Sequence, residues 1–307
     1  MIKKCRAYLR NEWALYLMLV PGLFFLIVYK FLPLYGITLA FKDYNIFLGS
    51  NPIEAITLSK WVGFKHFDRL FNNPDFYNVL RNTLTINLYK IAFLFPVPVV
   101  FAIFLNEIHH KLYKRTVQTL IYIPYFFSWV IVFGVFYSLL GTYGMVNQLL
   151  KQFGIEPISF FSNKAYFRGL LVFTEGWKEV GWNTVIYLAA ISAIDPTLFE
   201  AARVDGASRI QQIWHVTLPG LLPTIILMLI MKVGYILDTG FEQILVMYNP
   251  MVYDVADVIQ TYVYRIGLGQ MDYSLSTALG LFNSVVAFVL IVGANFVSRK
   301  TLHRSIW

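Results

Sequence analysis

The sequence predicts an all-α membrane protein with six transmembrane helices. Of its 307 residues, 58% are hydrophobic and 14% are charged, and the mean hydropathy is +0.60. Soluble domains carry about 25% charged residues, so this chain lacks the polar surface of a soluble fold. It also contains six apolar stretches, each near the ~20 residues that cross a bilayer core. These stretches lie at roughly 13–36, 82–105, 118–140, 168–194, 222–247 and 276–298.

The basic residues predict how these spans are oriented, because short cytoplasmic loops are enriched in Lys and Arg. Such residues gather in the tail 1–12, in the loops 111–115 and 195–223, and in the tail 299–307. These four segments alternate along the chain so that they share one side of the membrane. We therefore expect both termini in the cytoplasm and an extracytoplasmic segment at 37–81. The net charge of +8 is assigned to the membrane surface, with no nucleic-acid partner.

Two short helices are expected outside the membrane. Phe64, Phe67 and Phe71 are spaced to lie along one face of a helix at the membrane interface. A second outer helix is expected from Gly144 to Gly154, where glycine can end a helix with a left-handed residue.

The loop at 195–223 follows the sequence rules of helix ends. Asp195 is a good N-cap and Pro196 suits the first helical position, so a helix is expected from Pro196 to about Val204. Gly206 is expected to end it, because a left-handed backbone costs glycine little.

A second helix is expected to follow directly in the same loop. Ser208 and Gln211 have the spacing of a capping box at its start, and Pro219 is expected to stop it. The small side chains of Ala201 and Ala202 on the first helix would let another protein approach closely. By these rules alone, the loop is equally an ordinary connection with two surface helices.

The chain shows no catalytic constellation and no metal-ligand cluster. It has no Gly-x-x-x-x-Gly-Lys-Ser/Thr phosphate loop, no His-Glu-x-x-His and no Gly-x-Ser-x-Gly. The doublet His109-His110 lies in a basic loop, where solvation is the simpler explanation. We therefore expect no enzyme activity and no metal site.

Charged residues inside the spans indicate a polar path more directly. Lys232 lies near the middle of the fifth span and Lys90 lies inside the second; a lysine there costs about 2.5–3.5 kcal/mol without a partner or water. Glu175, Lys178 and Glu179 are expected to pair with one another at helical spacing. These groups are either structural ion pairs or part of an aromatic-lined path. The candidates for the path are Lys232, Lys90, Trp177, Lys178, Glu179, Trp182, Asn183, Tyr235 and Asn283.

A resemblance to the EAA loop of ABC-importer permeases rests on the order Glu200-Ala201-Ala202, Asp205-Gly206-Ala207, Leu218-Pro219 and Pro223. In that family the loop is the coupling helix, which sits in a cleft of the cytoplasmic ATPase. The resemblance assigns ATPase coupling to Glu200, Ala201, Ala202, Asp205, Gly206, Ala207 and Pro219. It also implies the five-helix core of type I importers at 82–298, with the first span at 13–36 as an addition.

Other segments look like carbohydrate permeases, most of all the branch that imports oligosaccharides and polysaccharide fragments. They are Ile123 to Val130, Gly176-Trp177 through Trp182-Asn183, Gly240-Phe241-Glu242, 261–265 and 305–307. The resemblance implies ATP-driven import by alternating access in the bacterial cytoplasmic membrane, with ATP and Mg bound by a separate subunit. The implied partners are a second homologous permease, an ABC ATPase dimer, an extracytoplasmic solute-binding lipoprotein and a sugar.

Two points stay open at this stage. The outer segment 37–81 is either a folded cap or a docking surface for the binding protein. Lys232 either pairs with the second permease or contacts polar or acidic groups of the sugar. The alternatives to sugar import are an ABC importer for a non-sugar solute and a secondary transporter. The absence of paired broken spans in matching halves disfavours the latter.

Overall fold

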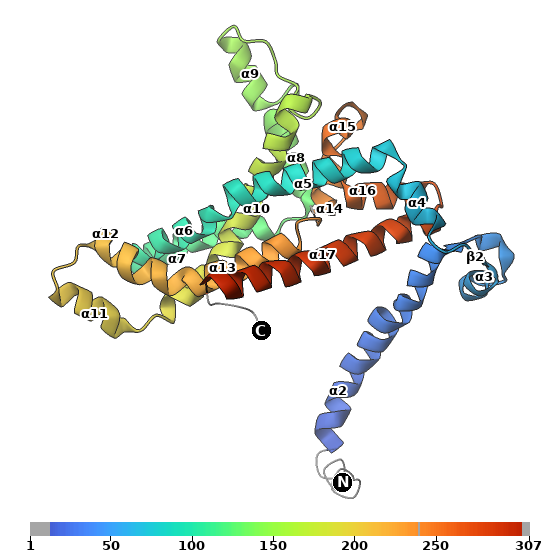
Figure 1. The fold of residues 1–307 in the computed structure, drawn as a ribbon. Coiled ribbons are helices and arrows are strands. Elements are labelled where there is room, and N and C mark those ends of the chain that lie inside the picture. The colour runs from blue at the N-terminus through green and yellow to red at the C-terminus, as the bar shows by residue number, and fades with distance from the viewer. Residues whose placement is uncertain (1–12, 239, 303–307) are drawn as a thin grey trace, which may run out of the picture. The chain divides into compact units, whose positions relative to one another are not determined.

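The computed structural model describes residues 13–238 and 240–302, and most of them are helical (Figure 1). The expected tails at 1–12 and 303–307 lie outside the described residues. The chain divides into two compact units. The smaller unit comprises the described residues up to Asn72 together with Val263–Phe282, and the larger unit comprises Asn73–Tyr262 together with the described residues from Asn283 onward.

The smaller unit combines a long apolar helix with a small polar and aromatic cap. Its elements are α2 (Trp13–Leu26), the π-helical η1 (Ile27–Phe31), the 3-10 helical η2 (Leu32–Phe41), β1 (Lys42–Asp43), η3 (Ile46–Leu48), α3 (Pro52–Leu58), β2 (Lys60–Trp61), α4 (Lys65–Phe71) and the π-helical η7 (Arg265–Gly269). The two strands pair antiparallel, with Lys42 opposite Trp61. The continuous helix from Trp13 to Phe41 buries none of its most apolar window within the described chain.

An aromatic cluster holds the cap together. The Phe41 ring lies 5.7 Å from Trp61, 5.5 Å from Phe64 and 5.6 Å from Phe67, between ring centroids. Helix α4 therefore confirms the expected short aromatic helix. Phe64 is its N-cap, and the Phe71 ring contacts the Phe282 ring.

The larger unit is a helical bundle. Its elements are α5 (Pro74–Leu94), α6 (Pro96–Glu107), α7 (Lys111–Tyr122), η4 (Ile123–Phe126), α8 (Trp129–Leu140), α9 (Met145–Gln152), α10 (Lys164–Ser192), α11 (Pro196–Val204), α12 (Arg209–Gln212), the π-helical η5 (Ile213–Thr217), α13 (Leu218–Gly234), α14 (Phe241–Met247), η6 (Pro250–Val252) and α15 (Tyr253–Ala256). Two helices, α16 (Ile259–Tyr264) and α17 (Tyr273–Leu302), contribute residues to both units. Helix α9 confirms that a helix lies between Gly144 and Gly154, and Gly154 just beyond it is left-handed with φ +73°.

Helix α10 is the central helix of the larger unit, where it packs against α5, α6 and α13. Its first half places Phe167 and Leu171 in an apolar cluster with residues of α5, α8 and α14. Its second half places Tyr187 and Ile191 in another cluster with residues of α6 and α13. Between these two apolar clusters, the stretch 174–183 is rich in polar residues. The arrangement holds charged side chains in the middle of the bundle.

Five helices in the described chain are long and apolar enough to cross a membrane, and α10 with α11, bent by 69°, makes a sixth. The expected number of spans is thus confirmed, but two of their expected ranges are wrong. The stretch 118–140 is interrupted between α7 and α8, where Pro124 begins a 3-10 turn and Ser128 caps α8. The stretch 222–247 is interrupted after Gly234, because Gly240 is left-handed and α14 begins only at Phe241.

The expectation that Pro219 stops a helix is also wrong. Helix α12 passes through the π-helical turn η5 into α13, and Pro219 occupies the first turn of α13. The π-helical turn directly before it alters the local backbone hydrogen bonding and so accommodates the proline within a continuing helix. The second helix of the loop is therefore continuous with the fifth span, and a displacement of one end is transmitted to the other.

Candidate functional site

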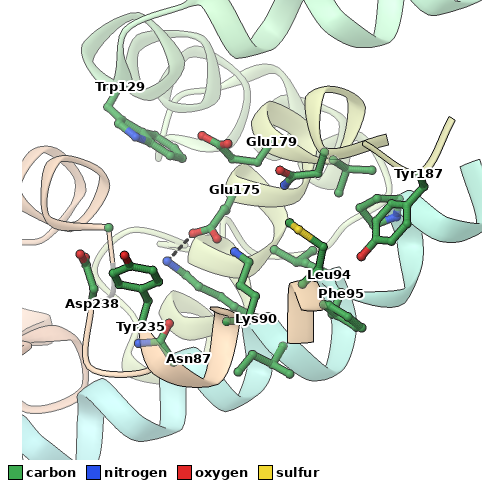
Figure 2. A pocket seen from close by; sticks show the side chains of 17 residues that line it. Asn87, Lys90, Leu94, Phe95, Trp129, Glu175, Glu179, Tyr187, Tyr235 and Asp238 are labelled. Atoms are coloured by element: carbon green, nitrogen blue, oxygen red, sulfur yellow. Dashed lines mark ion pairs between the residues drawn. The ribbon is translucent and has the colours of Figure 1, made fainter. Parts of the chain in front are cut away.

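A central cavity of about 280 Å³ lies beside the polar middle of α10 (Figure 2). Its walls come from α5, α6, α8, α10, α13 and the residues 235, 238 and 240 that follow α13. Five of the expected path residues border it, namely Lys90, Glu179, Asn183, Lys232 and Tyr235. The cavity is also bordered by residues that were not predicted to line the path, among them Asn87, Trp129, Glu175, Tyr187 and Asp238.

Helical spacing explains how α10 lines this cavity. Glu175, Glu179 and Asn183 follow one another at intervals of four residues, which places them on one face of the helix. Tyr187 continues the same row, borders the cavity and belongs to the second apolar cluster. The signal was thus present in the sequence, but the row also fits an ordinary polar face.

Lys90 is compensated within the described chain. Its ammonium forms an ion pair with Glu175 and donates a hydrogen bond of 2.9 Å to Oε1 of Gln243. Gln243 is fully buried, and its amide donates to the carbonyl of Leu171 at 2.7 Å and to Oγ1 of Thr174 at 2.9 Å. A buried lysine needs such partners. The expected pairing of Glu175 with Lys178 is therefore wrong, because Glu175 faces Lys90 on α5 (Figure 2).

Side chains of neighbouring helices donate hydrogen bonds to the break in the fifth span. The Asn87 amide donates to the carbonyl of Ile236 at 2.6 Å, and the Gln260 amide donates to Oδ1 of Asp238 at 2.7 Å. Irregular backbone at membrane depth is tolerated where it is buried in protein or lines a cavity, and this segment does both. A Cβ built on Gly240 would lie 3.6 Å from Nζ of Lys90, so the break is adjacent to the ion pair.

Lys232 differs from Lys90 in having an open ammonium. Within the part of the chain that the structure describes, Lys232 makes no hydrogen bond and no ion pair. Glu179 is close enough to interact with it electrostatically. The Tyr235 ring on the same wall is 54% exposed. Lys232 and Tyr235 are therefore available to a solute in the cavity.

Four expected path residues do not border the cavity. Lys178 is buried, and its ammonium donates a hydrogen bond of 2.7 Å to the carbonyl of Tyr125. The same ammonium lies over the rings of Tyr125 and Trp129 and forms an ion pair of 3.6 Å with Glu179. The Trp182 ring stacks on Tyr125 at 4.6 Å. These contacts hold the interrupted third span against α10.

The remaining two lie elsewhere in the larger unit. Trp177 borders a separate hollow between α10 and the α5–α6 segment. Asn283 has a buried Oδ1 without a hydrogen-bond partner within the described chain, and it lies away from the cavity.

The helix pair α11–α12 confirms most of the expected local structure. The Asp195 carboxylate caps α11 by accepting from the N–H of Thr197 at 2.9 Å, and Gly206 has φ +76°. Both hydrogen bonds of the capping box between Ser208 and Gln211 are present. No residue of α11 is buried. This end of the bundle also exposes Leu198, Val204, Ile210 and Trp214.

The expected coupling residues border two hollows on this surface. Glu200 lies in one of about 230 Å³, beside an ion pair of 3.5 Å between Arg209 and Glu107. The second hollow, of about 300 Å³, is bordered by Ala202, Asp205, Gly206 and Ala207. Ala201 is exposed on α11, and Pro219 lies in the first turn of α13.

Residues 95–303 match the family model described as "Binding-protein-dependent transport system inner membrane component". The chain belongs to this family. The permease is 46% identical over 287 residues to the polygalacturonan/rhamnogalacturonan transport system permease protein YteP of Bacillus subtilis (strain 168), a match that covers 93% of this chain and 88% of that protein. It is a multi-pass membrane protein with the fold of the type I ABC permeases.

Two solved structures resemble the permease over nearly its whole length. One is a bacterial ABC transporter involved in the import of the acidic polysaccharide alginate, with a TM-score of 0.87, 38% identity and coverage of 97% of this chain and 99% of that one. The other is a bacterial alginate ABC transporter in complex with an alginate pentasaccharide-bound periplasmic protein, with a TM-score of 0.86, 38% identity and coverage of 97% and 98%.

Proposed function

We propose that this permease is a transmembrane subunit of an ATP-driven importer for carbohydrate, either an oligosaccharide or a polysaccharide fragment. One observation carries the proposal. Helix α10 borders a cavity with charged and aromatic walls and leads, through a bend of 69°, into the exposed helix α11. The named substrates of the related proteins, polygalacturonan, rhamnogalacturonan and alginate, support a sugar.

In this proposal the exposed helix pair docks on a separate ATPase, and that ATPase binds ATP and Mg. Glu200, Ala201 and Ala202 form the contact surface on α11. Asp205, Gly206 and Ala207 form the turn that fixes the angle to α12. The continuity of α12 with α13 through Pro219 supports the transmission of ATPase closure to the cavity, and alternating access follows from that movement.

The remaining partners follow from the same architecture. A second homologous permease completes the path, an ATPase dimer drives it, and an extracytoplasmic solute-binding lipoprotein delivers the sugar. The solved complex with a periplasmic protein supports the last of these. The positive-inside rule supports cytoplasmic termini in a bacterial cytoplasmic membrane.

Lys232 is the side chain that we assign to the solute. Its ammonium is open toward the cavity, whereas Lys90 is already neutralised by Glu175. A carboxylate or hydroxyl group of the sugar would compensate the charge that the membrane interior penalises. Tyr235, Glu179 and Asn183 supply an aromatic face and hydrogen-bonding groups around it.

Reconstituted transport tests this proposal. The permease is co-purified with its partners, placed in proteoliposomes and supplied with the binding protein loaded with an oligogalacturonate. Uptake should require ATP, and Lys232→Met should reduce it while the complex still assembles. Lys232→Arg should retain most of it. Lys164→Met, which removes a cation outside the cavity, is the matched control. Uptake driven by an ion gradient without ATP would contradict the proposal.

A further inference from the structure

The smaller unit contains a cavity of its own, which we call the outer hollow. Its volume is about 520 Å³, within the range of about 300–1,000 Å³ that is typical of small-molecule sites. It lies between the segment 43–48, the residues 58 and 60, and the residues 271 and 273. All of these belong to the smaller unit, and the cavity beside α10 shares none of them.

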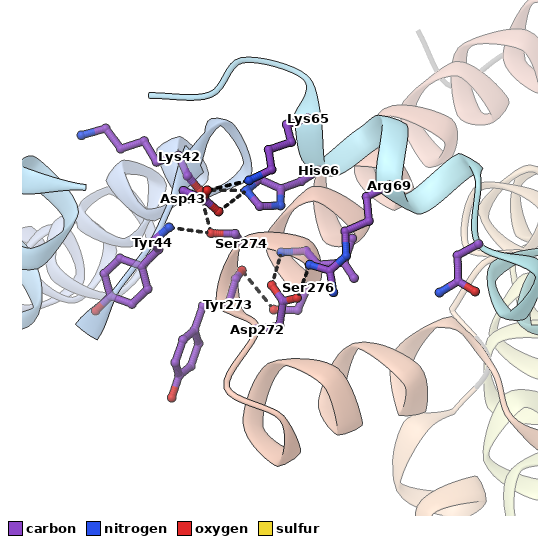
Figure 3. A network of polar contacts seen from close by, with 12 residues as sticks. Lys42, Asp43, Tyr44, Lys65, His66, Arg69, Asp272, Tyr273, Ser274 and Ser276 are labelled. Atoms are coloured by element: carbon purple, nitrogen blue, oxygen red, sulfur yellow. Dashed lines mark hydrogen bonds and ion pairs between the residues drawn. The ribbon is translucent and has the colours of Figure 1, made fainter. Parts of the chain in front are cut away.

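Two tyrosines form the aromatic part of the outer hollow. The rings of Tyr44 and Tyr273 meet edge to face, with centroids 5.7 Å apart and an angle of 84° between the planes. Both rings project in the same direction, away from the polar network behind them (Figure 3). Within the described residues, neither hydroxyl makes a hydrogen bond. The pair thus presents ring faces together with two open hydroxyl groups.

The backbone beneath these tyrosines is held in place. The buried Ser274 hydroxyl accepts a hydrogen bond of 3.0 Å from the N–H of Tyr44 and donates one of 2.7 Å to the carbonyl of Lys42. Asp272 accepts from the N–H of Leu275 at 3.0 Å and pairs with Arg69 at 2.6 Å. Side chains on such a fixed base lose little conformational entropy when they bind a ligand.

The edge of the outer hollow shows backbone strain. Among the described residues other than glycine, Met271 is the one with a positive φ, at 57°. Left-handed backbone costs a non-glycine residue about 1–3 kcal/mol, and such strain is concentrated at ligand sites. Met271 borders the hollow directly before Asp272 and Tyr273. The strain therefore occurs at the point where the chain positions one of the two tyrosines.

Charged and amide groups complete the rim. The Lys65 ammonium, 2.6 Å from the Asp43 carboxylate, holds the pKa of Asp43 below its usual value, so this acid stays ionised. Lys60 makes no ion pair within the described chain, and its ammonium is open to a ligand. Asn45 adds a neutral polar side chain to the lining of the hollow.

We propose that the outer hollow is a second saccharide-binding site, separate from the central cavity. A sugar ring has apolar C–H faces and polar edges. Its faces fit against Tyr44 and Tyr273, and its hydroxyl or carboxylate groups meet Lys60, Asn45 and the tyrosine hydroxyls. An acyl chain would leave this polar rim unpaired, which favours a sugar over a lipid. The inference rests on the proposed carbohydrate transport and adds to it a saccharide site within the smaller unit.

Direct sugar binding tests the outer hollow. The assembled permease–ATPase complex is placed in nanodiscs without ATP or binding protein, and tetragalacturonate is titrated with detection by saturation-transfer NMR. The double variant Tyr44→Ala/Tyr273→Ala should raise the Kd about ten-fold, because it removes both ring contacts. Tyr44→Phe/Tyr273→Phe keeps the rings and should have a smaller effect. Tyr35→Ala removes a 46% exposed ring of the same unit, outside both the hollow and the Phe41 cluster, and should bind as the parent does.

The outcomes separate this inference from the proposed function. The same titration on Lys232→Met removes any contribution of the central cavity. An unchanged Kd for the sugar in both tyrosine variants overturns the inference. The inference is also overturned if the alanine double variant keeps its affinity for the sugar but loses affinity for the sugar-free binding protein. If the parent complex transports oligogalacturonate but does not bind it without the binding protein, the inference fails and the proposed function stands. If the parent binds the sugar at the hollow but transports no saccharide, the proposed function fails.

An assembly check distinguishes a variant that has lost the site from one that no longer folds. Each variant is checked for complex assembly by size-exclusion chromatography. If the alanine pair does not assemble, Tyr44→Ala alone and the phenylalanine pair are titrated in its place. An unchanged sugar Kd in both of these overturns the inference.

Discussion

The ammonium of Lys90 on α5 forms an ion pair with the carboxylate of Glu175 on α10, and both groups border the central cavity. Gln243 on α14 accepts a hydrogen bond from the same ammonium. Three helices are thus joined at one charged centre beside the break of the fifth span. The pair removes one lysine and one carboxylate from the groups that a solute can contact, which distinguishes Lys90 from Lys232.

We expect Lys90→Met to destabilise the permease strongly. Removing one partner of a buried pair leaves the other charge uncompensated, at a cost of about 3–5 kcal/mol. Lys90→Met/Glu175→Met should recover most of that loss. Thermal unfolding of the purified complex in detergent measures both. Lys164→Met breaks an exposed pair with Asp254 and should cost only about 0–1 kcal/mol. Equal losses for Lys90→Met and Lys164→Met would show that the buried pair is unimportant.

Gly181→Ala should disturb the contact between α10 and the end of α7. A Cβ at this position would lie 1.8 Å from the carbonyl oxygen of Ile121, so the backbone must move. Overpacking of this kind costs about 1–3 kcal/mol. Gly293→Ala, at a helical glycine with free space around it, is the control. Yield and thermal stability in detergent measure the effect, and a variant as stable as the control would refute this close packing.

Gly206→Val should uncouple the ATPase while the permease still inserts in the membrane. The left-handed φ of +76° is strained for a β-branched residue, so the angle between α11 and α12 should change. Gly206→Asn should be milder, since asparagine visits this conformation more readily. The measurement is ATPase activity stimulated by the loaded binding protein. Full stimulation in Gly206→Val would show that this turn does not transmit the signal.

Lys65→Met should change how the smaller unit responds to acid. In the folded chain the pKa of Asp43 is lowered from 3.8, chiefly by its hydrogen bond from Lys65. The resulting stabilisation is present above this pH and is lost as the pH falls through the lower folded value. Because both groups are about half exposed, the contribution is at most about 1 kcal/mol. Carboxyl NMR of isotope-labelled protein should show the Asp43 pKa rising in Lys65→Met, and an unchanged pKa would exclude the pair as its cause.

Local sequence rules predicted the parts of the permease that depend on adjacent residues. The N-cap Asp195, the left-handed Gly206 and the capping box at Ser208 all involve hydrogen bonds or dihedral angles within a few residues. The order of residues in this loop also indicated the family. The polar residues inside apolar spans, among them Lys232, Glu179 and Asn183, predicted part of the cavity lining, because charge in a span indicates a polar path.

Contacts between distant residues were beyond these rules. Lys90 and Glu175 come from different helices, and no spacing in the sequence relates them. The break after Gly234 was missed because apolar residues continue on both sides of Gly240, so hydropathy describes one uninterrupted stretch. Pro219 was misjudged because a π-helical turn before it changes the backbone that the proline ring meets. Each of these features depends on tertiary packing.

The position of Glu175 within α10 has a mechanical consequence. Seventeen residues separate it from Ser192, or about 25 Å of helix at 1.5 Å per residue. A hydrogen-bonded helix of this length moves as a rigid body. Its apolar packing around Tyr187 and Ile191 is the point about which it would pivot. A tilt of the α11 end by about 5° would displace the Glu175 end by about 2 Å. Such a shift is enough to separate a hydrogen-bonded ion pair. A movement of α11 and α12 would therefore break or form the ion pair between Lys90 and Glu175.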